Sequence, residues 1–374
     1  MKVKKVHVPY NYLPAQFSNY DDILNGWDAL IKSSDFTLGQ FVEDFEQSFA
    51  KYVGAEFCVA TNNGTDALIL SLKALGISTG DEVITPCNSF YATAGAIVAV
   101  GATPVFCDVD ARYQADVDDM ASRITARTKA LLPVHWAGAS PDMGALLELS
   151  KQHGLELVED ACMGIGGAWV GQHPGTFGRV GAFSMHPLKT LNVMGDGGMV
   201  VTDDGDLYEW MLMYRNHGMI DRDHIHMWGV NMRLQPLQAV VAKVMLQTLD
   251  ERLAKRRDIQ AGLDRAIQQN TDLTVPPRDP RNSETVSLYM LLSDKRDALL
   301  TYLDNEGIEA KIHYPVPLHL QRPGVALGYT KGRLPVAENQ ARKLVTVPAH
   351  EYLDEDQQQY LIHHLQTFAR QNTP

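Results

Sequence analysis

The feature that most constrains the fold is a regular alternation, over the first two-thirds of the chain, between short apolar runs and helix-like stretches. Phe57–Thr61 and Glu82–Thr85 have the composition of strands, and Ala67–Leu75 between them places leucines on one helical face. Strands that alternate with helices form a mostly parallel sheet covered on both faces, so we predict an α/β fold. The same pattern predicts further strands and helices at Tyr91–Val100, Pro104–Asp108, Lys129–His135, Met143–His153, Leu155–Asp160, Ala182–Ser184 and Met199–Thr202.

The chain is long enough for about two domains, since it has 374 residues. The pattern changes near residue 245, where Leu246–Gln268 has the charged, amphipathic composition of one long helix. We therefore predict a large domain over residues 1–250 and a smaller α+β domain over residues 251–374. In the smaller domain we expect strands at Ser287–Leu292 and Glu309–His313, and helices at Lys295–Asn305 and Asp354–Arg370.

The charge and hydropathy of the chain exclude several classes of partner. The net charge is −12, from 33 basic and 45 acidic residues, and no block of Lys or Arg is present. Such a chain is not expected to bind nucleic acid or an anionic membrane surface. It has no run of about 18 apolar residues and no signal-peptide core in residues 1–10. We therefore expect a cytoplasmic protein.

The four cysteines indicate neither a metal site nor a redox site. Cys58, Cys87, Cys107 and Cys162 form no CxxC pair, and no Cys/His set has zinc spacing. All four lie in or beside apolar segments. We expect small buried side chains in a reducing compartment, and no metal.

Polar residues follow several of the predicted strands, where ligands bind in parallel sheets. Gly64 and Thr65 stand between a strand and a helix. Gly64 would let the backbone approach an anion, Thr65 offers a hydroxyl, and the helix N-terminus offers free N–H groups. Ser184, after another strand, would supply a second hydroxyl. The alternative for the first pair is a simple helix cap, with Thr65 or Asp66 as the capping residue.

An aspartate and a lysine complete the chemistry of this predicted sheet edge. Asp160 ends a strand, and its carboxylate would pair with a cationic ring nitrogen or cap the next turn. Lys189 stands before a glycine cluster, either as an amine nucleophile or as a surface lysine. An aspartate for a pyridinium and a lysine for a Schiff base are what pyridoxal phosphate requires. Phe90, after another strand, would stack on the ring or belong to the core.

The order of ten motifs resembles the DegT/DnrJ/EryC1/StrS sugar aminotransferases, which are fold type I enzymes similar to aspartate aminotransferase. The resemblance runs from about Thr37 to His319. Ten ordered motifs are far more specific than any one of them. The motifs are Asn63–Leu68, Gly80–Thr85, Gly101–Val105, Pro133–His135, Val158–Ala161, Phe183–Lys189, Gly195–Gly198, Arg215–Gly218, Gly229–Leu234 and His313–His319.

The resemblance implies a role for each candidate. Lys189 would form the Schiff base and move protons, and Asp160 would pair with the pyridine nitrogen. Asn231 would reach the phosphate of the neighbouring subunit, which implies a homodimer with active sites at its interface. His313 and Tyr314 would lie near the sugar. Gly64, Thr65 and Ser184 would hold the phosphate, and Phe90 would stack on the ring.

The chain departs from the family pattern at two positions. Met163 stands where many members have Gln or His facing the phenolic oxygen of the cofactor, and Thr190 stands where Asn is usual. One branch of the family, which dehydrates deoxysugars, has His in place of the lysine. Here His186 precedes an intact Lys189 by three residues, so we expect His186 to pack locally or contact the substrate.

The resemblance implies a pyridoxal-phosphate aminotransferase that moves an amino group, with L-glutamate as the expected donor, to a keto or aldehyde sugar by a ping-pong mechanism. The expected acceptor is a nucleotide-linked keto-deoxysugar, in amino-sugar, lipopolysaccharide or polysaccharide biosynthesis. One alternative is a free, oxidised sugar acid of the 3-deoxy-octulosonate type. The others are a pyridoxal-phosphate sugar dehydratase and a non-catalytic, cofactor-binding regulator. Lys189 and the lack of an iron–sulfur cysteine set argue against the dehydratase. The lack of a basic patch argues against a regulator that binds DNA.

Overall fold

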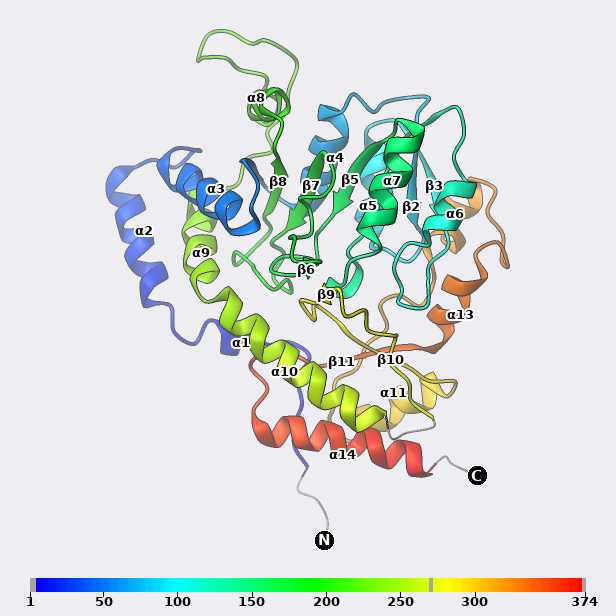
Figure 1. The fold of residues 1–374 in the computed structure, drawn as a ribbon. Coiled ribbons are helices and arrows are strands. Elements are labelled where there is room, and N and C mark those ends of the chain that lie inside the picture. The colour runs from blue at the N-terminus through cyan, green and yellow to red at the C-terminus, as the bar shows by residue number, and fades with distance from the viewer. Residues whose placement is uncertain (1–4, 269–271, 372–374) are drawn as a thin grey trace.

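A seven-stranded sheet forms the centre of the larger part of the molecule (Figure 1). The computed structural model describes residues 5–268 and 272–371. Strand β8 runs antiparallel to both of its neighbours, β1 and β7, and the other neighbouring pairs are parallel. In spatial order the strands are β1 (Phe57–Thr61), β8 (Gly198–Thr202), β7 (Val180–Ser184), β5 (Glu156–Asp160), β4 (Thr128–Leu131), β2 (Glu82–Pro86) and β3 (Thr103–Cys107). The predicted α/β class is confirmed.

Helices cover both faces of this sheet because successive strand residues point to opposite sides. In β7, Ala182 packs in one apolar cluster and Phe183 in another, and Val200 and Val201 of β8 divide in the same way. One face is covered by α4 (Gly64–Ala74), α5 (Tyr91–Ala99) and α8 (Gly205–Tyr214). The other is covered by α3 (Gln40–Val53), α6 (Val117–Ser122), α7 (Met143–His153) and α9 (Pro236–Gln247).

Local signals in the sequence set the ends of several helices. The side chain of Asn63 accepts from the N–H of Asp66 and caps α4, while Asp142 caps α7 in the same way. Gly154 ends α7 in the left-handed conformation, with φ of 62°. The predicted helix Met143–His153 is therefore confirmed with its predicted bounds.

A smaller α+β unit lies below the sheet in Figure 1. It contains α10 (Leu249–Ile267), α11 (Arg296–Asn305), α14 (Glu355–Gln371) and the antiparallel pair β10 (Tyr289–Leu292) and β11 (Leu344–Val347). Val8, near the start of the chain, packs in the same apolar cluster, and its N–H bonds the carbonyl of Gly307. The division at residue 250 stays a prediction.

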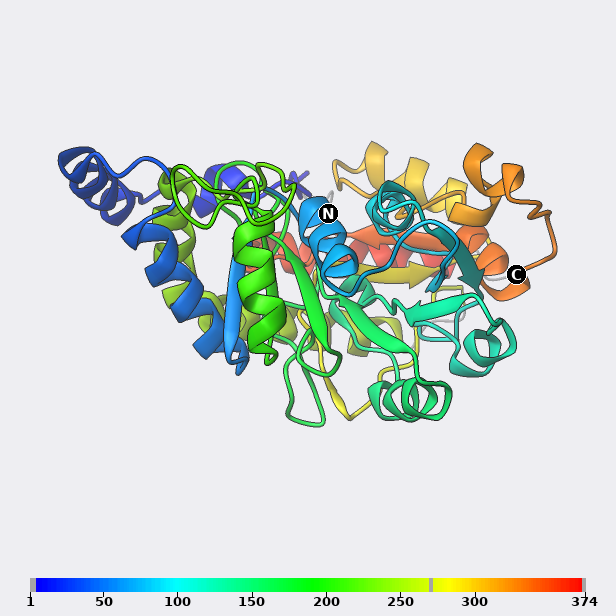
Figure 2. The ribbon, with the colours of Figure 1, turned by 90° about the horizontal axis from the view of Figure 1, so that it is seen from above.

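The other elements are short or peripheral. These elements are α1 (Leu13–Gln16), α2 (Asp21–Ser33), α12 (Arg322–Ala326), α13 (Pro335–Lys343), β6 (Ala168–Trp169), β9 (Asn282–Ser283) and two 3₁₀ turns, Trp136–Gly138 and Leu318–Leu320. Helix α2 lies at the edge of the molecule in both Figure 1 and Figure 2.

Two predicted elements of the C-terminal part differ from the structure. The predicted helix Leu246–Gln268 is present as α10 but begins three residues later, because α9 ends at Gln247 and the two helices meet at Thr248, a β-branched residue with φ of −109°. The expected strand Glu309–His313 has one bridge, from Lys311 to β11, because the N–H of Glu309 bonds the carbonyl of Val8 instead. The strand that pairs with β10 is β11.

Within residues 5–268 and 272–371 no helix combines the length and the apolar character needed to cross a bilayer. The same residues contain no group of three or more His, Cys, Asp or Glu side chains placed to hold a metal ion. All four cysteines are free thiols, and Cys58, Cys87 and Cys107 are buried.

A buried ion pair at the edge strand provides a test of what holds the sheet to its helices. The carboxylate of Glu46 accepts from the N–H of Ala60 at 2.7 Å and pairs with Arg215, whose Nη1 also donates to the carbonyl of Ala60. Glu46→Ala leaves a buried guanidinium unpaired and should lower the free energy of unfolding by about 3–5 kcal/mol in urea denaturation. As a control, Asp28→Ala removes an exposed pair with Lys32 and should cost no more than about 1 kcal/mol. Equal losses in the two variants would contradict this account.

Candidate active site

The loop that carries Lys189 follows β7 and is held from two directions. Its own turn is closed by the N–H of Lys189, which donates to the carbonyl of His186 at 2.8 Å. The phenol of Tyr12 donates to the carbonyl of Lys189 at 3.3 Å, and Arg252 of α10 donates to the carbonyl of Thr190 at 2.7 Å. The backbone at the lysine is thereby fixed by the N-terminal segment and by the smaller unit.

The charge of Lys189 shifts the pKa of three side chains, those of Cys162, His313 and His186. Burial raises the pKa of the Cys162 thiol well above its ordinary value, the charge of Asp160 adds to this, and Lys189 opposes it. Burial lowers the pKa of His313 to about 4, and the charges of Lys311 and Lys189 lower it further. Asp160 ends β5 and the loop of Lys189 follows β7, which pairs with β5 in parallel, so the two residues lie at the same edge of the sheet.

Asp160 is a buried carboxylate at the carboxyl end of β5. Both of its oxygens accept hydrogen bonds, Oδ2 from the hydroxyl of Thr93 at 2.7 Å and Oδ1 from the N–H of Cys162 at 3.2 Å. Its backbone N–H donates to the carbonyl of Pro133, and its carbonyl accepts from the N–H of His135 in the same neighbouring segment. These bonds leave the carboxylate little freedom to rotate.

The N-terminus of α4 lies against the end of β7. A Cβ added to Gly64 would come within 2.6 Å of the Cβ of Ser184, so only glycine permits this approach. Asn63 accepts from the N–H of Asp66, while the N–H groups of Gly64 and Thr65 have no intrahelical acceptor. With the hydroxyls of Thr65 and Ser184, these donors form a cradle for an anion.

Four aromatic rings, those of Phe90, Tyr91, Tyr314 and Trp136, form one contact cluster. Phe90 is 48% exposed, and its ring centroid lies 4.8 Å from that of Tyr91 and 6.0 Å from that of Tyr314. Tyr314 also lies 5.8 Å from Trp136, and these two residues pack in one apolar cluster with Met163. Burial raises the pKa of Tyr314. Met163 is held from behind by its carbonyl, to which Thr285 donates at 2.8 Å.

Two predicted site residues, His313 and His186, differ in their surroundings. His313 is part-buried, bonds the hydroxyl of Thr346 at 2.8 Å and stacks on Tyr10. His186 is exposed, although partial burial still lowers its pKa, with the charge of Asp196 opposing this and that of Lys189 adding to it.

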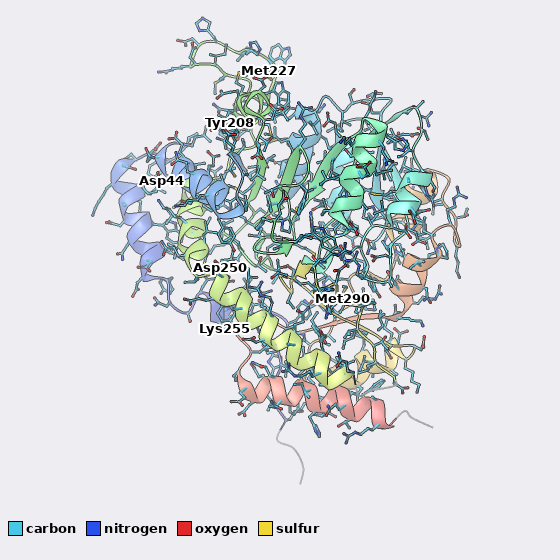
Figure 3. All side chains as sticks on the ribbon, viewed as in Figure 1. Asp44, Tyr208, Met227, Asp250, Lys255 and Met290 are labelled. Atoms are coloured by element: carbon cyan, nitrogen blue, oxygen red, sulfur yellow. The ribbon has the colours of Figure 1, made fainter. Side chains whose placement is uncertain are left out.

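Asn231 is exposed, beside a long loop over residues 217–230 that projects from the sheet. Its amide oxygen accepts from Arg233 at 3.0 Å. The loop extends away from the body of the molecule, as the labelled Met227 shows in Figure 3. Its Trp228 is 88% exposed and its Ile220 is 64% exposed.

Sequence reasoning missed the residues that support the site from behind. Thr93, Tyr12 and Arg252 carry no local motif, and each lies more than 60 residues from the group it bonds. Arg252 and Arg256 share the carboxylate of Glu351 in a buried cluster. The only sequence signal for this cluster was the charged face of the helix predicted around residue 252. A charged helical face is usually exposed to solvent, so it did not indicate a buried cluster.

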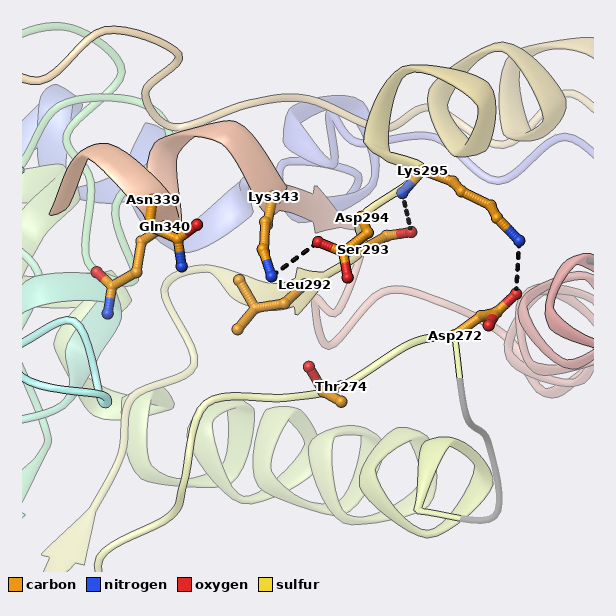
Figure 4. Close-up of a pocket in the computed structure, with 9 residues that line it drawn as sticks. All are labelled: Asp272, Thr274, Leu292, Ser293, Asp294, Lys295, Asn339, Gln340 and Lys343. Atoms are coloured by element: carbon orange, nitrogen blue, oxygen red, sulfur yellow. Dashed lines mark hydrogen bonds and ion pairs between the residues drawn. The ribbon is translucent and has the colours of Figure 1, made fainter. Parts of the chain in front are cut away.

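A pocket in the smaller unit lies between β10, α13 and the segment that begins at Asp272 (Figure 4). Two ion pairs line it, Lys343 with Asp294 at 2.7 Å and Lys295 with Asp272 at 3.2 Å. None of its nine lining residues is among the predicted site residues.

Comparison with known proteins agrees with the resemblance seen in the sequence. Residues 19–366 match the model of the DegT/DnrJ/EryC1/StrS aminotransferase family. The chain is 36% identical to a pleiotropic regulatory protein of Geobacillus stearothermophilus, over 98% of this chain and 99% of the relative. It is 38% identical to a UDP-N-acetyl-3-dehydro-alpha-D-glucosamine 3-aminotransferase of Acidithiobacillus ferrooxidans, over 94% of this chain and 95% of the relative.

Solved structures are similar over nearly the whole chain. The crystal structure of S. venezuelae DesV in complex with a ketimine intermediate has a TM-score of 0.95 at 35% identity, over 97% of this chain and 98% of that chain. The structure of NtdA from Bacillus subtilis with bound cofactor PMP has a TM-score of 0.92 at 26% identity, over 99% of this chain and 87% of that chain. The predicted fold of the aminotransferase type is confirmed.

The lowered pKa of His313 predicts a pH dependence of stability. The pKa of this side chain is 6.5 in the unfolded chain and about 4 in the folded protein. Between pH 4 and 6.5 the unfolded chain therefore binds a proton that the folded chain does not. The free energy of unfolding should therefore fall as the pH drops from 6.5 to 4, and this loss is absent above pH 6.5. In Tm measurements from pH 7.5 to 4, His313→Gln should show a shallower decline than the wild type. An unchanged decline would mean that other groups account for it.

Proposed function

The chain belongs to the DegT/DnrJ/EryC1/StrS aminotransferase family, and from this premise we propose that it transfers an amino group from L-glutamate to a nucleotide-linked keto sugar, using pyridoxal phosphate. It is a sugar aminotransferase. The observation that carries the proposal is that Asp160 ends β5 and the loop of Lys189 follows β7, the parallel strand paired with β5, so both residues lie at the same edge of the sheet. A carboxylate for the ring nitrogen and an amine for the carbonyl are what the cofactor requires.

The residues present fit the chemical parts of this cofactor. The cradle of Gly64, Thr65 and Ser184 suits a phosphate, because it offers N–H and O–H donors, and the carboxylate of Asp66 in the same turn accepts from the amide of Asn63. Asp160 suits the ring nitrogen, Phe90 suits the ring face, and the amine of Lys189 suits the aldehyde. When bound, the cofactor supplies an electron-accepting ring that stabilises a carbanion next to nitrogen.

Each side chain then has a defined task. The Nζ of Lys189 would hold the cofactor covalently and would carry a proton to and from the reacting carbon. Asp160, whose two oxygens accept from Thr93 and Cys162, would keep the ring nitrogen protonated. His313 is neutral at pH 7, so it accepts or donates a hydrogen bond to a sugar hydroxyl without repelling the lysine ammonium.

The nucleotide-linked acceptor is supported by the UDP-sugar named for the Acidithiobacillus relative. The name of the Geobacillus relative keeps a regulatory role as the second candidate. A cofactor-binding regulator would also use Lys189 and Asp160, so catalysis is favoured by the aminotransferases among the relatives and solved structures. We also propose the cytoplasm as the compartment, in keeping with four free cysteines.

We further propose that the protein works as a homodimer. The support is the loop 217–230, which exposes Ile220, Ile225 and Trp228 to solvent in a single chain. Exposed apolar side chains gathered on one segment indicate a protein contact. Asn231, which borders this loop, would then contribute its amide to the phosphate site of the partner.

Borohydride reduction tests the role of the lysine. In the wild type, reduction should leave the cofactor on Lys189 as a mass increase of the tryptic peptide, because only an attached cofactor is trapped. Lys189→Ala should show no such increase. As a matched control, Lys311→Ala removes another lysine whose charge acts on His313 and should still trap the cofactor. Trapping in Lys189→Ala would remove the central claim.

A panel of acceptors tests the substrate. Glutamate is supplied with UDP- and dTDP-linked keto sugars and with a free oxidised 3-deoxy-octulosonate, and the amine products are measured by mass spectrometry. We expect product only from nucleotide-linked sugars. If only the free sugar acid gives a product, the proposed nucleotide-linked acceptor is wrong and the free sugar acid takes its place. If no acceptor gives a product, a regulatory role is favoured.

A further inference from the structure

The start of α5 carries two buried hydroxyl groups that the proposed reaction does not yet use. The Oγ1 of Thr93 lies 2.7 Å from the Oδ2 of Asp160, and the Oγ of Ser89 lies 2.6 Å from the Oγ1 of Thr93. None of the three side chains belongs to a residue more than 4% exposed. Water therefore does not compete for these bonds.

The direction of this chain of hydrogen bonds follows from the number of protons. A hydroxyl has one proton to donate, and an ionised carboxylate can only accept. Thr93 therefore donates to Asp160, and Ser89 must be the donor to Thr93. Each bond polarises the next, which strengthens the donation at the carboxylate.

We propose that Thr93, oriented by Ser89, is a positioning residue that fixes the Asp160 carboxylate toward the ring nitrogen of the cofactor. The inference rests on the proposed function. Oδ2 is held by Thr93 and Oδ1 by the N–H of Cys162, so the plane of the carboxylate is defined by two donors from different segments. Partners that orient a functional group in this way are part of the site, although they touch neither substrate nor cofactor.

The same helical turn also places the aromatic ring proposed to cover the cofactor. Phe90 is the residue before the first turn of α5, and its carbonyl accepts from the N–H of Thr93 at 3.2 Å. The ring-face residue and the residue that orients the ring-nitrogen partner are thus joined by one backbone hydrogen bond. A shift of this turn would disturb both together.

Thr93→Val tests the proposal, because valine keeps the shape of the side chain and removes only the hydroxyl. We expect borohydride still to trap the cofactor on Lys189, while the absorbance spectrum of the bound cofactor changes. The kcat of the glutamate half-reaction should fall about 10- to 100-fold with little change in KM, as for partners of metal ligands. Thr93→Ser, which restores the hydroxyl, should recover most of this loss.

Thr85→Val is the matched control. Thr85 is also fully buried, and its hydroxyl donates to the carbonyl of Leu132 at 2.9 Å. This variant should lose thermal stability but keep the wild-type spectrum and kcat. If Thr93→Val behaves like Thr85→Val, the Thr93 hydroxyl is merely structural and the proposal is wrong.

Ser89→Ala keeps the test decisive if Thr93→Val does not fold. This variant keeps the hydrogen bond from Thr93 to Asp160 but removes the Ser89 hydroxyl that orients Thr93. The kcat should therefore also fall, by a smaller factor than in Thr93→Val. An unchanged kcat would contradict the proposal. A wild-type protein that takes up no cofactor would overturn the proposed function as well, whereas a fully active enzyme insensitive to both variants would overturn this inference alone.

Discussion

The buried carboxylate of Asp160 is the constraint on which the site depends. A carboxylate removed from water must be given hydrogen-bond donors, and these come here from the hydroxyl of Thr93 and the N–H of Cys162. To supply them, the start of α5 must lie over the end of β5, although β4 separates β5 from β2, the strand that leads into α5. That placement also sets Phe90 above the same space.

A second buried cluster connects this site to the rest of the molecule. Arg252 bonds the loop of Lys189 through the carbonyl of Thr190, and it shares the carboxylate of Glu351 with Arg256. Arg256 lies over the ring of Tyr12, whose hydroxyl reaches the carbonyl of Lys189. The lysine is thus positioned by residues from both ends of the chain, and a buried ion cluster of this kind specifies geometry more than it adds stability.

The parts of the fold that the sequence predicted are those with a local cause. The alternation of strands with helices predicts a sheet covered on both faces, and Gly154 predicts the end of α7. The start of α4 was wrong, because the expected caps were Thr65 or Asp66, whereas Asn63 is the capping residue and the helix begins at Gly64. The break at Thr248 and the partner of β10 were missed. Amphipathic periodicity continues across a bend between two helices, and strand pairing depends on which edge is free.

The sequence by itself determined the residue types at the strand ends, and with them the family and the kind of chemistry: an amine at Lys189, a carboxylate at Asp160 and a glycine at Gly64. Only the tertiary structure decided that Thr93 bonds Asp160 across 67 residues, that Tyr12 bonds Lys189 across 177, and that Gly64 touches Ser184. The physical reason is range. Periodicity, caps and turns act within a few residues, whereas a hydrogen bond between distant segments exists only after the sheet has brought its strand ends together.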